Sequence, residues 1–242
     1  MAKSMVTLEK KVSPTDAVQC VSLKKPELHA EVILLTSGYC TGAPTEAGYP
    51  GSDAETVAAC TVQELLMECC DRLLASGEYR DNRLLRPALM DTLREADRRL
   101  TQYGAEIVRG VYASGVVGFR QENLTLYIPF GGATIYRVLG DKRLKRIGGG
   151  IPEMGLVCDA VGGNGTEKIR PFTCNESEGN RLIFTTAPLD NMEHCKQIIA
   201  AEPTDALRNV TAGLLHAQMR QPYAGVVDYR IHDWGDSGAE EQ

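Results

Sequence analysis

The sequence lacks the features that would mark a membrane protein, a secreted protein or a nucleic-acid binder. No stretch approaches the roughly 20 consecutive apolar residues of a transmembrane helix. Residues 1–11 are polar and carry several lysines, without the apolar stretch of a secretory signal. The formal net charge is −6, so the excess of basic residues that a nucleic-acid binder usually shows is missing. We therefore expect a cytoplasmic protein that binds neither membrane nor nucleic acid.

Several catalytic and metal-binding motifs are also missing. The eight cysteines form no Cys-x-x-Cys pair, so a structural zinc site has no support and buried free thiols are expected. Glu46 stands six residues after Cys40, where a cysteine phosphatase needs Arg. Leu35 fills the first glycine position of a Gly-x-Ser-x-Gly motif around Ser37. The glycine-rich stretches 148–150 and 162–165 are not followed by the Lys-Ser/Thr of a phosphate-binding loop.

The pattern of apolar residues predicts an α+β fold with two mainly antiparallel sheets flanked by helices. Apolar runs predict strands at 31–36, 111–119, 124–130, 134–138, 181–186 and 226–231. Ser52 and Glu55 form a capping box that opens a helix ending at Gly77, and Pro87 is expected in the first turn of a second helix. Further helices are expected at 192–200 and from Pro203 onward. We expect a polar arm at 1–15, one domain at 16–234 and a polar tail at 235–242.

The C-terminal third carries the most specific resemblance to a known family. Asn180-Arg-Leu-Ile-Phe-Thr-Thr-Ala-Pro-Leu-Asp-Asn-Met192 resembles the strand and Ser-Asp-Gly-Leu motif of PP2C-type (PPM) metal-dependent serine/threonine phosphatases. Ala187 stands where that family has a metal-binding Asp. Further on, Pro222-Tyr-Ala-Gly-Val-Val-Asp-Tyr-Arg-Ile231 resembles the family's Asp-Asn-x-Thr motif and final strand, with Pro222 in place of the last metal-binding Asp.

Three upstream motifs are similar to those of the same family and follow in the family's order. Lys11-Val-Ser-Pro-Thr-Asp-Ala17 is similar to Arg-x-x-Asn-Glu-Asp-Ala and keeps Asp16. Thr36-Ser-Gly-Tyr-Cys-Thr41 matches the strand end that holds the first metal-binding Asp, with Ser37 at that position and Gly38 kept. Gly131-Gly-Ala-Thr-Ile-Tyr136 resembles Gly-Asp-Ser-Arg-Ala-Tyr, with Gly132 in place of Asp.

The resemblance implies a four-layer αββα sandwich with a cleft at one end. Enzymes of this family use two divalent metals to activate a water that attacks phosphoserine or phosphothreonine. Such metals need anionic oxygen ligands, which a serine hydroxyl, alanine and proline do not supply. We therefore expect no catalytic residues, no metal and no cofactor. The degenerate cleft is expected to comprise Lys11, Asp16, Ser37, Gly38, Gly132, Ala187 and Pro222.

The sequence leaves three functions open. The first is a catalytically inactive PP2C-like domain, or pseudophosphatase, that acts as a scaffold, regulatory or assembly subunit through contacts with a protein partner. The second is an active phosphatase that depends on Mn²⁺ or Mg²⁺ at a non-standard metal site, for which Asp16 and Asp190 are the weak candidates and Asp159 is a further nearby acid. The third is a sensor that binds a small molecule in the cleft.

Overall fold

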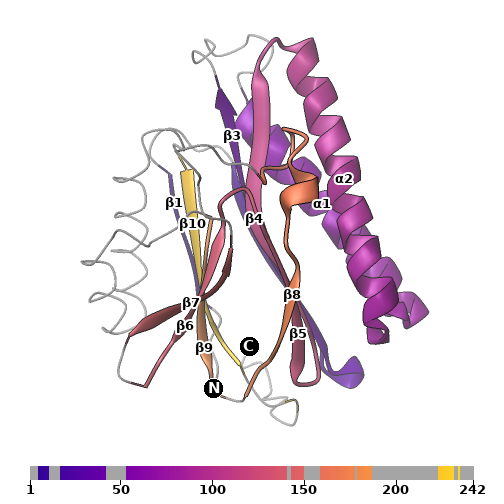
Figure 1. Ribbon diagram of the computed structural model, residues 1–242, viewed down its shortest axis with the longest axis vertical. Coiled ribbons are helices and arrows are strands. Elements are labelled where there is room, and N and C mark those ends of the chain that lie inside the picture. The colour runs from indigo at the N-terminus through magenta and orange to yellow at the C-terminus, as the bar shows by residue number, and fades with distance from the viewer. Residues whose placement is uncertain are drawn as a thin grey trace, which may run out of the picture.

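The computed structural model describes residues 5–10, 17–41, 53–140, 143–149, 159–177, 179–186, 223–231 and 234. Within them, two antiparallel sheets lie face to face, and two long helices cover the outer face of the second sheet (Figure 1). The first sheet has the order β1 (Met5–Lys10), β10 (Tyr223–Arg230), β9 (Arg181–Thr185), β6 (Thr134–Val138) and β7 (Leu144–Gly149). The second has the order β2 (Val18–Lys25), β3 (Ala30–Thr41), β4 (Gly110–Gln121), β5 (Leu124–Phe130) and β8 (Phe172–Asn175).

The helices are α1 (Ala54–Ser76) and α2 (Asn82–Glu106), and three single turns of 3-10 helix lie at Pro26–Leu28, Glu78–Arg80 and Thr166–Lys168. The predicted α+β class with two antiparallel sheets is confirmed. The helices predicted at 192–200 and from Pro203 lie outside the described residues.

Both faces of strand β3 are buried, because one packs against the helices and the other against the first sheet. Val32 and Leu34 belong to the core between the second sheet and the helices, whereas Ile33 and Leu35 belong to the core between the two sheets. Successive side chains of a strand point to opposite faces, so a continuous apolar run is what a doubly covered strand needs. The run therefore lets β3, like β4 and β5, contribute to both cores.

Helix α2 begins earlier than the sequence indicated. Asp81 caps it, with its side chain accepting a hydrogen bond from Arg83 N at 2.8 Å. Pro87 consequently lies inside the helix and not in its first turn. A side-chain cap outweighs the preference of Pro for the first turn here, because it satisfies an N–H at the helix start.

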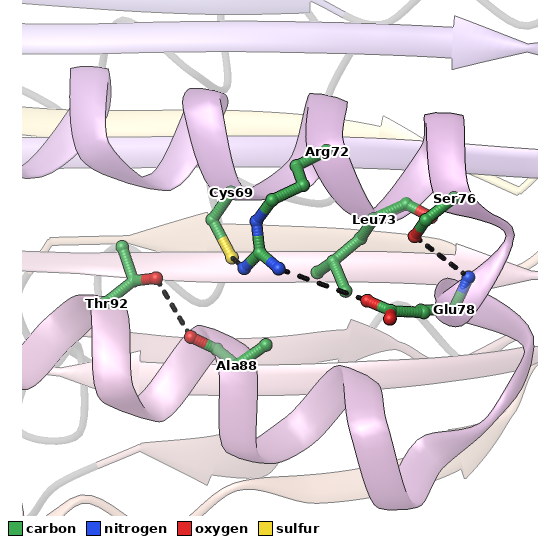
Figure 2. Close-up of polar contacts among 7 residues, drawn as sticks. All are labelled: Cys69, Arg72, Leu73, Ser76, Glu78, Ala88 and Thr92. Atoms are coloured by element: carbon green, nitrogen blue, oxygen red, sulfur yellow. Dashed lines mark hydrogen bonds and ion pairs between the residues drawn. The ribbon is translucent and has the colours of Figure 1, made fainter.

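The junction between the two helices is held by local polar contacts (Figure 2). Ser76 Oγ donates to Leu73 O and accepts from Glu78 N, both at 3.3 Å. Arg72 lies 3.6 Å from Cys69 Sγ and 3.9 Å from the Glu78 carboxylate. Gly77 has a φ of 77°, which suits glycine and lets the chain leave α1 where the sequence predicted.

Three segments differ from the sequence prediction. β3 continues to Thr41, beyond the strand predicted at 31–36, because Thr41 pairs in register with Gly110 of β4. Residues Met5–Lys10, expected in a polar arm, form β1 and pair with β10. Residues Leu144–Gly149 form β7, a strand that is not among those predicted from the apolar runs. In each case pairing with a distant strand, which local composition does not report, sets the structure.

Two triads of Tyr, Glu and Arg, each centred on a buried glutamate, connect the sheets. In the first, Tyr229 of β10 donates to Glu31 of β3, and Arg120 of β4 lies 3.9 Å from the same carboxylate oxygen. Burial, together with the Glu31 charge, raises the pKa of Tyr229, so its hydroxyl stays protonated and donates. We call this set the Glu31 triad.

The second set, the Glu176 triad, is built in the same way. Tyr127 of β5 donates to Glu176 at 3.0 Å, and Arg137 of β6 contacts both carboxylate oxygens at 2.9 and 2.8 Å. Both glutamates are buried, with relative exposures of 1% and 2%. A buried carboxylate is tolerated only when it is well paired, so each triad fixes how the sheets face one another.

Candidate functional site

Three of the seven residues predicted to line the cleft lie within the described part of the chain. Ser37 and Gly38 lie near the C-terminal end of β3, and Gly132 lies in the turn between β5 and β6. The other four, Lys11, Asp16, Ala187 and Pro222, lie outside the described residues, as does Asp190.

Ser37 faces a second serine across the β3–β4 ladder. Ser37 and Ser114 are register partners, and both are buried. Each lies two residues from a member of the core between the sheets, Leu35 and Val116, so both point into the space between the sheets. Ser114 Oγ has no hydrogen-bond partner among the described residues. The end of the inter-sheet core is therefore lined by hydroxyl groups at this point.

A third hydroxyl lies at the end of β9, immediately before the predicted cleft residue Ala187. Thr186 is buried, and its Oγ1 accepts a hydrogen bond from Gly225 N at 3.0 Å. The backbone pairs in the opposite sense, with Thr186 N donating to Gly225 O at 3.1 Å. Thr186 is thus tied to β10 through its hydroxyl and its backbone, and the sequence reasoning did not single it out.

Gly38 is required at its position by close packing. Its N–H donates to Ala17 O at 2.8 Å, and a Cβ built there would lie 1.8 Å from the carbonyl oxygen of Glu55. A real Cβ never approaches a backbone atom so closely, so any side chain would push the first turn of α1 away from β3. Gly38 therefore brings the start of α1 against the strand end that carries Ser37.

The β5–β6 turn brings Gly132 to the same region. Gly131 and Gly132 have φ angles of 66° and 81°, in the left-handed region that favours glycine. A Cβ on Gly131 would lie 2.4 Å from Ser114 Cα, so the turn packs directly on the serine pair. The structure thus brings Ser37, Gly38 and Gly132 to the same region, and their role in a cleft stays a prediction.

Asp159 is the one carboxylate that the described residues place at this turn. Its Oδ1 accepts a hydrogen bond from Gly132 N at 3.1 Å, and its backbone oxygen accepts from Gly131 N at 3.0 Å. Burial raises the pKa of Asp159 above its ordinary value of 3.8, and the backbone hydrogen bonds oppose this shift. Burial, with the Asp159 charge as a smaller cause, also raises the pKa of the nearby Tyr39.

Replacing Asp159 by asparagine is expected to flatten the dependence of stability on pH. The folded pKa lies above the unfolded one, so the stability that Asp159 contributes is present below about pH 3.8 and is lost as the pH rises through the folded value. Asparagine does not titrate, and its Oδ1 can still accept from Gly132 N. Thermal melts from pH 4 to 7 should show a smaller loss for Asp159→Asn than for the parent. A steeper loss in the variant would contradict the shift, and Asp159→Ala controls for the lost hydrogen bond.

The described residues do not by themselves fit a divalent metal. Ser37, Ser114 and Thr186 offer neutral hydroxyls, and Asp159 is the single carboxylate beside the turn. Within the described residues there is no group of three or more His, Cys, Asp or Glu side chains able to hold a metal. Mg²⁺ and Mn²⁺ prefer several anionic oxygens, so this donor set is too poor in charge.

Comparison with solved structures identifies the class of fold. The chain resembles a serine/threonine phosphatase of S. agalactiae, at 12% identity and a TM-score of 0.70, over 96% of this chain and 100% of that one. The catalytic domain of the serine/threonine phosphatase PstP of Mycobacterium tuberculosis matches at 12% identity and a TM-score of 0.64, over 96% and 99% of the two chains. The chain therefore has the fold of PP2C (PPM) serine/threonine phosphatases.

A third solved structure is PppA, described as a key regulatory component of T6SS in Pseudomonas aeruginosa. It matches at 14% identity and a TM-score of 0.61, over 95% of this chain and 98% of that one. No family model and no curated protein matches the sequence. The predicted resemblance to the PP2C fold is confirmed at the level of structure.

The comparisons correct one prediction. The sequence analysis expected no cofactor, but the PstP catalytic domain of this fold is solved in complex with 2 manganese ions. The expectation of no cofactor is wrong on this finding, because it was inferred from the loss of carboxylates at four positions and not from the fold as a whole. Manganese is therefore supplied in the activity measurements below.

One further prediction concerns membranes. Among the described helices, neither α1 nor α2 nor any shorter turn has the length and apolarity needed to cross a bilayer.

Proposed function

We propose that the protein is a catalytically inactive domain of PP2C fold that acts as a scaffold, regulatory or assembly subunit through contacts with protein partners. The observation that carries the proposal is the buried Ser37–Ser114 pair at the strand end where the resemblance places a metal-binding carboxylate. A hydroxyl is neutral at physiological pH, so it cannot offset the charge of two dications held a few ångströms apart.

The rest of the cleft, as proposed, is poor in charge in the same way. Gly132, Ala187 and Pro222 offer no side-chain oxygen, and Lys11 and Asp16 are the charged members. The phosphatase reaction of this fold depends on metals that polarise phosphate oxygens and activate water. A cleft with few anionic ligands would hold such metals weakly and orient them poorly, which supports a loss of turnover.

A regulatory role has support from one neighbour of the fold. PppA is described as a key regulatory component, and it shares almost the whole length of this chain. At 14% identity this likeness speaks for the fold, so the regulatory role of our protein remains a proposal.

The second candidate is an active serine/threonine phosphatase with a non-standard metal site. Asp159 favours it, because its partly buried carboxylate lies at the backbone of Gly132, where the resemblance places an Asp. The manganese-bound PstP structure favours it too. This candidate requires ligands beyond those that the described residues supply.

Hydrolysis of p-nitrophenyl phosphate in the presence of Mn²⁺ separates the two candidates. The inactive domain predicts release of nitrophenol at the protein-free rate, with the PstP catalytic domain as the positive control. Turnover that requires Mn²⁺ and falls at least tenfold in Asp159→Asn would instead establish the second candidate.

A further inference from the structure

The glycine-rich stretch 162–165 wraps around a carboxylate that belongs to α2. Asp97, with a relative exposure of 6%, accepts hydrogen bonds at Oδ1 from Gly162 N at 2.5 Å and from Asn164 N at 3.2 Å. Thr101, one turn further along α2, donates from Oγ1 to Gly162 O at 3.2 Å. Backbone N–H groups that converge on one anion form a nest, which is a common way of binding phosphate. In this chain the nest holds the protein's own carboxylate.

The backbone of the nest requires glycine at its first position. Gly162 and Asn164 have φ angles of 104° and 56°, a backbone that glycine adopts readily and asparagine more often than other residues. A Cβ on Gly162 would lie 2.1 Å from Val111 O, so the nest packs directly on the start of β4. The nest is therefore held between α2 and the second sheet.

The residues just before the nest hold the turn of the candidate site. Val161 exchanges two backbone hydrogen bonds with Ala113 of β4, at 2.8 and 3.2 Å. Two residues earlier, Asp159 accepts from Gly131 N through its backbone oxygen and from Gly132 N through its side chain. The chain thus runs from the turn to α2, and hydrogen bonds fix it at both ends and in the middle.

Residues 159–164, which we call the linking segment, therefore connect α2 to the candidate site. We propose that Asp97 is a positioning residue for that site. Its hold on the nest keeps the linking segment in place, and the linking segment keeps Gly131 and Gly132 packed against Ser114. Proteins open locally in cooperative units, so release of the segment at α2 loosens the turn at its other end.

The linking segment is a conformational device built into the fold. A shift of α2 against the second sheet displaces Asp97 and Thr101 together, because both belong to the helix. Such a shift changes the candidate site without any contact at the site itself, which is the requirement for coupling between two places in a protein. The proposal rests on the proposed function in one respect, since a regulatory domain needs a route of this kind.

Amide hydrogen exchange in the full chain tests the link. In Asp97→Ala the amides of Gly131 and Gly132 should exchange at least fivefold faster than in the parent, because the segment that carries Asp159 is no longer held at α2. Amides in the middle of β3 and β4 should keep their parent rates. A general loss of stability would speed the exchange of all these amides alike, so the pattern separates positioning from a merely structural role.

Two further variants sharpen the test. Asp91→Ala is the matched control, because Asp91 lies on the exposed face of α2, where it pairs with Arg94, and it should leave all these rates unchanged. In Asp159→Ala the amide of Gly132 has already lost its side-chain acceptor. Adding Asp97→Ala to that variant should therefore speed the exchange of Gly132 by less than twofold.

The proposal is overturned if Asp97→Ala speeds the two glycine amides by less than fivefold, if all amides accelerate together, or if the double variant gains twofold or more at Gly132. Should Asp97→Ala fail to fold, Asp97→Asn replaces it, and its neutral oxygen, a weaker acceptor, should still speed both glycines at least twofold. If neither variant folds, Asp97 supports the whole fold and the proposal fails. Phosphate release that depends on Mn²⁺ would refute the proposed function and leave this exchange pattern unchanged.

Discussion

Replacing Glu31 by alanine is expected to lower the free energy of unfolding by about 3–5 kcal/mol. The Glu31 carboxylate accepts from Tyr229 on one sheet and lies 3.9 Å from Arg120 on the other. Tyr229 and Arg120 are themselves buried, at 2% and 4% exposure, so the loss of their shared partner cannot be made good by water. Removal of one member of a buried ion pair leaves an uncompensated charge, which is the costly case.

Urea unfolding of the parent and of two variants measures this effect. Glu27→Ala serves as the matched control, because Glu27 is exposed and lies four residues away in the turn before β3. It should change stability by less than about 0.5 kcal/mol. A loss below about 1 kcal/mol for Glu31→Ala would show that the triad does not hold the sheets together.

The second large effect is expected when Ser37 is replaced by aspartate. The side chain would enter a buried position opposite Ser114, between two sheets whose described residues there are neutral. Burial of a carboxylate without a charged partner costs several kcal/mol, so we expect a loss of about 3 kcal/mol without added metal. For a domain of this size the melting temperature would fall by roughly 6–12 °C.

Ser37→Asn is the control for the second prediction, because it has nearly the same shape as the aspartate and no charge. It should lose clearly less stability than Ser37→Asp in thermal melts at neutral pH. Equal melting temperatures for the two variants would mean that the charge is compensated, and the cleft would then be less neutral than we infer. The same reasoning predicts that Ala187→Asp does not melt above the parent without metal.

Much of the fold was predictable because strong local signals agree with the tertiary structure. The pattern at Ser52 and Glu55 predicted the start of α1 to within two residues, although the N-cap residue is Asp53 and its side chain makes no capping hydrogen bond, and Gly77 predicted the end. The apolar run at 31–36 predicted the doubly buried part of β3. These signals succeed because the period of the apolar residues reflects burial, and because glycine at a helix end suits the left-handed backbone there.

The errors lie where a distant strand decides the structure. β3 continues through Tyr39 and Cys40 because β4 offers backbone partners up to Gly110, which the loop-like composition beyond Thr41 does not indicate. β1 pairs with β10, more than 200 residues away in the sequence, so its short alternation of Val6 and Leu8 could not be judged locally. Pairing over such distances leaves little trace in a short window of sequence.

The candidate site was predictable only through order and position of motifs. The resemblance placed Ser37, Gly38 and Gly132 at one cleft, and the structure brings these three residues to the same region. Ser114 and Thr186 were missed, because a serine or threonine in an apolar strand has no distinctive pattern. The hydrogen bond from Gly132 N to the Asp159 carboxylate could not be predicted either, since 27 residues separate the two in the sequence.

The central claim is that the PP2C fold of this chain does not turn over phosphate. The most direct test is the hydrolysis of a phosphoserine peptide by the full chain during a calorimetric titration with Mn²⁺, with free phosphate measured in the same sample. The account predicts no phosphate release above the protein-free rate at any manganese concentration. Phosphate release that rises with Mn²⁺, saturates and falls at least tenfold in Asp159→Asn would contradict it and would place the active centre at the Gly131–Gly132 turn.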